Sequence, residues 1–406
     1  MNQVWAGLML ISILVASIRW GTGDTEVLEK VVESSFDMAR LSVEIAIGLV
    51  GLLALWSGLF RIAEQAGLVA KISRGLTPLF SRLMPEVPAG HPAQGAITMN
   101  LAANMLGLDN AATPLGIRAM QALQQLNPVA NTASNAQILF LVLNTSSVTL
   151  LPVTIFMYRA QAGAASPTDV FIPILLATTA STLSGLLAVM AIQKIRVDAV
   201  ILGWLAGLVA VIASFIYWLG QLPVEQLSQV SSSVANGLLL LIIGLFVAAG
   251  LIRRVRIYDE FVEGAKSGFE TAVMLIPYLV AMLVAIGMFR ASGALELLLQ
   301  GIGSLLAAAG ITTAFVDALP VAFMKPFSGS GSRAMMLETI NAYGVDSLAG
   351  RLAAIMQGST ETTFYVLTVY FGVVGITRMR YALWAGLLCD AVGITTAIIV
   401  GMWFFA

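Results

Sequence analysis

The chain has 406 residues, of which 58% are hydrophobic and 11% are charged, a composition typical of a helical membrane protein and too poor in charge for a soluble one of this length. Its formal net charge of −1 gives no indication of a nucleic-acid partner. One cysteine and one histidine exclude an internal disulfide and a Cys/His cluster for a transition metal.

Apolar runs recur along the chain, each close to the roughly 20 residues that a helix needs to cross a bilayer. The first run has no lysine or arginine before it, which favours a retained transmembrane helix over a secretory signal. The predicted spans are residues 2–18, 41–60, 136–158, 170–193, 199–219, 231–252, 270–289, 352–371 and 381–405. No low-complexity linker divides them, so we expect one membrane unit.

Two further apolar stretches, residues 92–126 and 301–340, are broken repeatedly by Gly, Pro, Asn and Ser. Unpaired backbone groups are costly in lipid, so breaks at membrane depth usually line a cavity for a solute. We expect these stretches to form re-entrant hairpins or unwound helices. The predicted fold class is an all-α polytopic membrane protein with re-entrant hairpins and discontinuous helices.

The sequence also contains an internal repeat. Residues 114–120 match residues 329–335, and the same offset of 215 places Asn144–Ser147 over Ser359–Thr362. An unpaired crossing between two copies inverts the second relative to the first, so we expect inverted-topology repeats. The predicted parts are a first copy at residues 1–197, a linking transmembrane helix at residues 198–220 and a second copy at residues 221–406.

Basic residues concentrate in four loops, which share one side if each broken stretch makes an even number of crossings. The positive-inside rule then places these loops and the N-terminus in the cytoplasm, and the C-terminus outside. The loops contain Arg61, Lys71, Arg74 and Arg82; Lys194 and Arg196; Arg253, Arg254 and Arg256; and Arg378 and Arg380.

The first candidate site element runs from Lys325 to Arg333 and opens a predicted helix at residues 334–340. Free amides at a helix start, the hydroxyls of Ser328, Ser330 and Ser332, and two cations suit an anionic group. The alternative is a flexible turn in which Arg333 pairs with Glu338 or with lipid headgroups.

The second element interrupts an apolar helix and places one carboxylate, Glu361, among hydrogen-bond donors. An intramembrane carboxylate is costly unless it is paired, protonated or facing water, so Glu361 is a candidate proton carrier, Na⁺ ligand or acceptor for the solute. The alternative is a structural glutamate satisfied by nearby hydroxyls and Arg351. The element comprises Gln357, Ser359, Thr360, Glu361 and Thr362.

The repeat mate of this element has a serine at the position of Glu361, and its hydroxyls either face a ligand or bond back to their own helix. It comprises Asn144, Thr145, Ser146 and Ser147. A third element gathers amide, carboxylate and hydroxyl oxygens near Pro114; it resembles a sodium site, or else caps the next helix. Its members are Asn100, Asn104, Asp109, Asn110 and Thr113. Weaker candidates are Glu44, Asp317 and Asp390, which lie near helix ends or pair across helices.

Four segments resemble known proteins: residues 104–118, 144–152, 325–333 and 356–365 are similar to spore maturation protein A followed by spore maturation protein B, fused in one chain. Both belong to the nucleoside-recognition, or Gate, family, which is similar to the cores of concentrative nucleoside transporters and of ferrous-iron transporter B. The resemblance implies a bacterial inner-membrane protein with paired hairpins and unwound helices around a central site. The separate A and B proteins are associated with dehydration of the spore core.

We therefore expect a secondary transporter of a small polar or anionic solute, coupled to H⁺ or Na⁺. Lys325 and Arg333 would hold an anionic group, opposite Asn144–Ser147 and with Asn104 nearby, and Glu361 would act in binding or coupling. A different class stays open, a non-transporting membrane scaffold or ligand sensor. No nucleophile with an adjacent base indicates an enzyme, and no cofactor is expected besides the coupling ion. The expected partners are a solute and the bilayer; carriers of this kind often form homo-oligomers.

Overall fold

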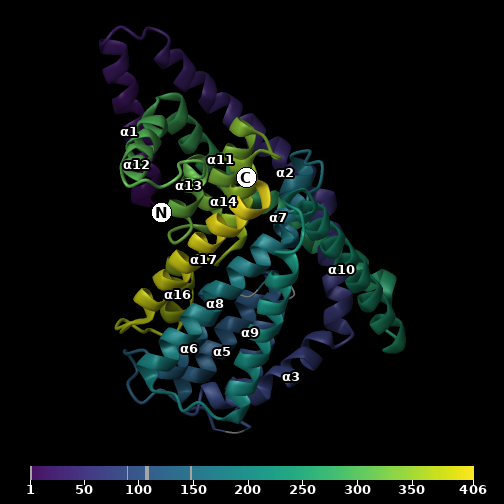
Figure 1. Ribbon diagram of the computed structural model, residues 1–406. Coiled ribbons are helices and arrows are strands. Elements are labelled where there is room, and N and C mark those ends of the chain that lie inside the picture. Colours follow the sequence, from purple (N-terminus) through teal and green to yellow (C-terminus); the bar gives the residue numbers. More distant parts are fainter. Residues whose placement is uncertain (1, 89, 106–108, 147–148) are drawn as a thin grey trace.

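The computed structural model describes residues 2–88, 90–105, 109–146 and 149–406, except for the side chains of residues 2–4 and 109–111. Throughout this part of the chain the regular elements are helices (Figure 1). Six of them are long and apolar enough to cross a membrane, so the protein is a multi-pass membrane protein. They are α2 (Val27–Gln65), α8 (Phe171–Gln193), α9 (Ala199–Leu219), α10 (Val224–Ile252), α11 (Ile257–Ala291) and α17 (Ala382–Phe405).

The remaining helices are shorter and include the N-terminal apolar run, which forms α1 and packs against α11 through a hydrogen bond from Trp5 Nε1 to the Ala281 carbonyl oxygen (2.8 Å). The shorter elements are α1 (Asn2–Gly21), α3 (Leu68–Leu83), α4 (Pro92–Met105), α5 (Asp109–Gln125), α6 (Asn135–Ser146), α7 (Val153–Gln161), α12 (Ala294–Ala308), a 3₁₀ turn η1 (Val316–Ala318), α13 (Leu319–Met324), α14 (Gly329–Tyr343), α15 (Leu348–Gly358) and α16 (Thr363–Val373).

Two predicted spans are not continuous helices: the crossing expected for residues 136–158 is corrected, and the interruption predicted within residues 352–371 is confirmed. The first is divided into α6 and α7, and the second into α15 and α16. Pro152 precedes α7 with a non-helical backbone, since proline donates no amide hydrogen to a helix that would continue through it. Thr362 precedes α16 in an extended conformation (φ −81°, ψ 103°). Both breaks fall in the polar segments that the sequence had singled out.

The second half of the chain follows the element order of the first. Helices α10–α12 take the places of α1–α3, the pair α13–α14 that of α4–α5, the broken helix α15–α16 that of α6–α7, and α17 that of α8; α9 stands between the two series. Of the stretch predicted as the second hairpin, the N-terminal part belongs to α12, so the helix pair begins only at Leu319.

Helices α2 and α11 pack against each other in antiparallel directions over much of their length. Gly58 contacts Phe261, whereas Gly268 lies against Leu53, so residue numbers rise along one helix as they fall along the other. Gly264 and Gly268 form a Gly-x-x-x-Gly pattern that lets the backbones approach closely. A Cβ atom on Gly268 would come within 2.5 Å of the Leu53 carbonyl oxygen. This contact requires glycine.

Helices α8 and α17 form a second antiparallel pair, and Figure 1 shows them side by side. Ser181 Oγ donates a hydrogen bond to the Cys389 carbonyl oxygen (3.0 Å). Gly185 faces Cys389, and Gly393 faces Ser181, which fixes the direction of the pair. Helices in equivalent places of the two series therefore meet in opposite directions.

A buried ion network ties the two series together outside the long helices. Arg159, at the end of α7, is fully buried and binds the Asp169 carboxylate (Nη2–Oδ1 2.9 Å) and the Val345 carbonyl oxygen (3.0 Å). Arg351 of α15 binds the other oxygen of Asp169 (2.9 Å), and Asp346 accepts from Arg159 as well. Removing one member would leave a buried charge uncompensated, so the network fixes α15 relative to α7.

The basic loops are connected by polar contacts. Arg82 of α3 binds Asp198, the residue that caps α9 (2.7 Å), and Arg61 at the end of α2 binds Glu260 at the start of α11 (2.8 Å). Asn135 accepts hydrogen bonds from Arg380, in the loop before α17, and from Gln193, at the end of α8. These contacts agree with the prediction that the four basic loops share one side.

Candidate functional site

The two broken helices meet at their breaks. The backbone amide of Glu361, between α15 and α16, donates to the carbonyl oxygen of Thr145 in the last turn of α6 (2.8 Å). The first turn of α14 lies beside them, because a Cβ atom on Gly329 would contact Thr362 Oγ1 at 3.0 Å. Ser328 caps α14 by accepting from the Gly331 amide (2.9 Å). Three helix ends thus converge on one place.

A small pocket of about 80 Å³, which we call the central pocket, opens at this place. Five predicted site residues line it, from the end of α13, from α14, from the end of α15 and from the second break: Lys325, Arg333, Gln357, Thr360 and Glu361. The rest of its lining consists of Thr149, Leu151, Pro152, Thr154, Ile155, Tyr158, Gly329 and Gly358. The pocket therefore combines two cations, one carboxylate and the start of a helix.

Lys325 links two of the converging elements. Its side chain is only 3% exposed, and its ammonium group donates to the Gln357 carbonyl oxygen (2.6 Å) near the end of α15, where cations are favoured. Ser332 Oγ, one turn into α14, contacts Gln357 Oε1 at 2.5 Å. These bonds hold the first turn of α14 against the end of α15, with the lysine charge in the pocket wall.

The alternative interpretation paired Arg333 with Glu338 or with lipid headgroups; Glu338 pairs with Arg290 instead, and the contact with lipid stays a prediction. The guanidinium group of Arg333 lies over the ring of Tyr158, 5.5 Å from the ring centroid, in a cation–π contact. Glu338 accepts instead from Arg290 Nη2 (3.0 Å). The arginine lines the pocket because α7 brings Tyr158 to it, a neighbour that no sequence spacing indicated.

Glu361 is exposed and lines the central pocket, so its carboxylate meets the need to face water. The structural alternative satisfied Glu361 with nearby hydroxyls and Arg351; its arginine part is wrong, and its hydroxyl part stays a prediction. Arg351 binds Asp169 and approaches Asp346, as described for the ion network.

The other predicted residues that the structure describes lie outside the lining of the central pocket. Asn104 donates to Asn144 Oδ1 (2.9 Å), and the amide of Asn100 donates to the Ala112 carbonyl oxygen (2.7 Å). Thr145 supplies the carbonyl oxygen that binds Glu361, and Ser146 Oγ bonds weakly to its own helix (3.4 Å). Their proposed role in binding solute or ion stays a prediction.

Among the described residues, the remaining candidates do not line the central pocket. Ser330 contacts Ser328 (3.3 Å), and Ser359 Oγ donates to the Met356 carbonyl oxygen (2.8 Å) in its own helix. Thr113 lies on α5, outside the lining of the central pocket. The predictions for Ser147 and for the side chains of Asp109 and Asn110 fall outside the described residues.

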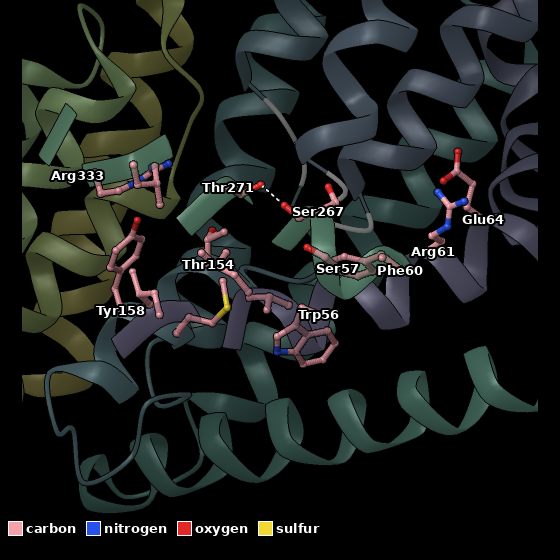
Figure 2. Close-up of a pocket in the computed structure, with 16 residues that line it drawn as sticks. Trp56, Ser57, Phe60, Arg61, Glu64, Thr154, Tyr158, Ser267, Thr271 and Arg333 are labelled. Carbon is pink, nitrogen blue, oxygen red and sulfur yellow. Dashed lines mark hydrogen bonds between the residues drawn. The ribbon is translucent and has the colours of Figure 1, made fainter. Parts of the chain in front are cut away.

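A larger pocket of about 320 Å³ adjoins the central one, and sequence analysis missed it. Figure 2 shows Arg333 and Tyr158 at one end and Arg61 and Glu64 at the other. Both pockets share Arg333, Tyr158 and Thr154, so the cation–π pair stands at their junction. The large pocket is lined by α2, α7, α11 and α14: Leu49, Leu53, Trp56, Ser57, Phe60, Arg61, Glu64, Val153, Thr154, Met157, Tyr158, Gly264, Ser267, Thr271, Leu275 and Arg333.

The only sequence signal for the large pocket was a set of hydroxyls, Ser57, Ser267 and Thr271, within apolar helices. Trp56 and Phe60 add aromatic surface, with ring centroids 5.7 Å apart. The pocket thus offers an apolar and aromatic wall with a few hydroxyls, beside the charged central pocket.

Comparison with known proteins identifies the family of the chain. The family model described as Gate, nucleoside recognition, matches residues 46–161 and 272–377, which include both broken helices. Spore maturation protein B of Bacillus subtilis is 46% identical over 171 residues, which are 41% of this chain and 94% of that protein. Spore maturation protein A of the same organism is 41% identical over 186 residues, 46% of this chain and 92% of that protein. Neither relative is named as an enzyme. The chain therefore belongs to the Gate, or nucleoside-recognition, family of membrane proteins and is related to spore maturation proteins A and B.

Proposed function

We propose that the protein is a secondary transporter of a small anionic solute, coupled to H⁺ or Na⁺, in the bacterial inner membrane. The observation that carries the proposal is the central pocket, where Lys325, Arg333 and Glu361 meet at the crossing of two broken helices. Charges at membrane depth are costly and generally serve a function, and helix breaks at such a depth suit a solute site.

The two cations favour an anionic group on the solute. Ammonium and guanidinium groups form short, charge-assisted bonds with carboxylate and phosphate oxygens. The first turn of α14 adds the positive end of a helix dipole, and its Gly329 lets a ligand approach the backbone. Glu361 would then discriminate, by accepting from a donor on the solute and by repelling solutes with excess negative charge.

The two pockets differ in size, so each suits a different part of the solute. The central pocket, about 80 Å³, suits a single charged group, and the adjoining 320 Å³ pocket suits an organic body. The family description names nucleoside recognition. Trp56, Phe60 and Tyr158 provide aromatic faces on which a base would stack. Nucleoside monophosphates therefore join carboxylates among the solutes to test.

The proposed transport cycle uses the two series of helices as inverted repeats, with a first copy at residues 1–197, a linking helix at 198–220 and a second copy at 221–406. The antiparallel packing of α2 with α11 and of α8 with α17 supports this arrangement. Inverted repeats around one site permit alternating access by rocking of one part against the other. The shared side of the basic loops supports a cytoplasmic N-terminus.

Thermal unfolding of the purified protein with nucleosides, nucleoside monophosphates, dicarboxylates and amino acids would test the site. We expect an anionic solute to raise the melting temperature of the wild type. The shift should vanish in Lys325→Gln and Arg333→Gln and change its solute preference in Glu361→Gln. Lys71→Gln, an exposed lysine on α3, is the matched control. A shift that survives both pocket substitutions would refute the site. Binding without solute flux in liposomes would favour the ligand-sensor alternative.

A further inference from the structure

The carboxylate of Asp390, in the middle of α17, lies outside the lining of both pockets. Its side chain is only 2% exposed. One carboxylate oxygen, Oδ2, accepts from Thr363 Oγ1 (2.6 Å), whereas Oδ1 is buried and accepts no hydrogen bond. A carboxylate inside a membrane helix is costly unless a proton or a cation neutralises it, so Asp390 calls for an explanation.

The second helix break lies directly on the face of α17 that holds Asp390. Gly386 and Gly393 flank the aspartate on this face, at helical spacings of four and three residues. A Cβ atom on Gly393 would come within 2.6 Å of Thr360 Cγ2, and one on Gly386 within 2.7 Å of Thr363 Cγ2. The two glycines thus let the segment at 359–363 press against the carboxylate.

Hydroxyl oxygens without hydrogen bonds gather at the same break. Thr360 Oγ1 is buried and lies near enough to the Asp390 carboxylate to interact with it. Thr145 Oγ1 and Thr362 Oγ1, the latter facing Gly329, are also buried and have no hydrogen-bond partner. Buried polar atoms without partners are rare in folded proteins, and an ion is one accepted reason for them. Carboxylate and hydroxyl oxygens are the ligands that hard cations prefer.

The charged groups that act on Asp390 are Lys325 and Glu361. Both line the central pocket, and Thr360 faces both the pocket and the carboxylate. We propose that Asp390, with Thr360 and the neighbouring hydroxyls, is a binding site for a monovalent cation, Na⁺ or H⁺, behind the wall of the central pocket. This inference rests on the proposed function, because it names the coupling site of the transporter.

The placement explains how cation and anion would be coupled. When Asp390 is ionised, its negative charge repels an anion in the adjacent pocket and partly cancels the attraction of Lys325 for that anion. A bound cation or proton removes that charge, so the lysine field becomes available to the solute. By linkage, the solute strengthens cation binding by the same factor. The exposed Glu361 contacts the solute in this scheme, whereas the buried Asp390 takes the cation.

The experiment measures cation binding without any solute. Thermal unfolding of the full chain is compared in sodium and choline buffers at several pH values, for wild type, Asp390→Asn and Thr360→Val. Asparagine preserves the shape of the side chain and can still accept from Thr363, and Thr360→Val keeps the carboxylate if the first variant fails to fold. Asp317→Asn, whose carboxylate instead accepts from Tyr343 OH, is the matched control.

Stabilisation by sodium that is lost in Asp390→Asn and Thr360→Val, but kept in Asp317→Asn, would support a Na⁺ site. A pH dependence that is lost in Asp390→Asn and kept in Thr360→Val, with no effect of sodium, would support a proton site. Identical sodium and pH responses in wild type and Asp390→Asn would overturn the inference. If the cation site is overturned in this way but a solute still raises the melting temperature, the proposed function stands without it. If cations stabilise the protein but no solute does, the proposed transport function is refuted and the cation site stands.

Discussion

Replacing Gly268 by alanine should destabilise the protein through the contact between α2 and α11. The added Cβ atom would lie 2.5 Å from the Leu53 carbonyl oxygen and 2.7 Å from the Ala54 Cα atom. Both are backbone atoms, which cannot move without shifting a helix. Overpacking of this kind costs about 1–3 kcal/mol, more than the gain of about 1 kcal/mol in helix propensity.

Gly301→Ala in α12 provides the control, because a Cβ atom there meets nothing within 4 Å. This substitution should leave the free energy of unfolding unchanged or raise it by up to about 1 kcal/mol. Unfolding of both variants in the same detergent, by heat and by denaturant, measures the difference. If Gly268→Ala proves as stable as Gly301→Ala, the close antiparallel packing of α2 and α11 is wrong.

Three further substitutions test the ion network, the cap of α9 and the junction of the pockets. Asp169→Asn leaves two arginine side chains without their shared carboxylate and should cost about 3 kcal/mol of unfolding free energy; wild-type stability would contradict the network. The amide of Ile201 and an arginine on α3 lower the pKa of Asp198. The ionised Asp198 therefore stabilises the fold above about pH 4, and this stabilisation is lost as the pH falls. The free energy of unfolding should depend less steeply on acid pH in Asp198→Asn than in wild type, and equal slopes would refute the cap. Tyr158→Phe should keep the cation–π contact with Arg333 and the solute-induced thermal shift, whereas Tyr158→Leu should weaken both; equal shifts would exclude a role for the ring.

Much of the architecture could be predicted from the sequence because lipid penalises exposed backbone so strongly. The polar segment at Gln357–Thr362 predicted a helix break, and α15 does end there. The end of α6 at Ser146 was not predicted, because residues 136–158 read as one apolar span. The match of residues 114–120 with 329–335 placed equivalent helices, α5 and α14, in the two halves. Structural features that depend on a local sequence pattern could therefore be predicted from the sequence.

The partners of individual side chains were not predictable in the same way. One alternative paired Arg333 with Glu338, which is close in sequence, but the fold brings Arg333 to Tyr158 of α7. Asp390 was a weaker candidate because its neighbours, Thr360 and Thr363, come from the second helix break and the start of α16. Spacing along one helix indicates a shared face, but it does not identify what a second helix places opposite.

The large pocket was missed for the same reason. Its lining comes from α2, α7, α11 and α14, and none of these contributes a contiguous motif. Trp56 and Phe60 looked like ordinary apolar residues of a membrane span, and only the antiparallel contact with α11 places Ser267 near them. Pockets assembled from single residues of several helices carry little signal in one sequence.

Solute flux in proteoliposomes tests the central claim most directly. The solute selected by thermal stabilisation would be loaded inside, and uptake of labelled solute by exchange would be compared for wild type, Lys325→Gln and the control Lys71→Gln. We predict saturable uptake by wild type and Lys71→Gln and none by Lys325→Gln. Uptake that does not saturate, or that continues unchanged in Lys325→Gln, would contradict transport through the central pocket.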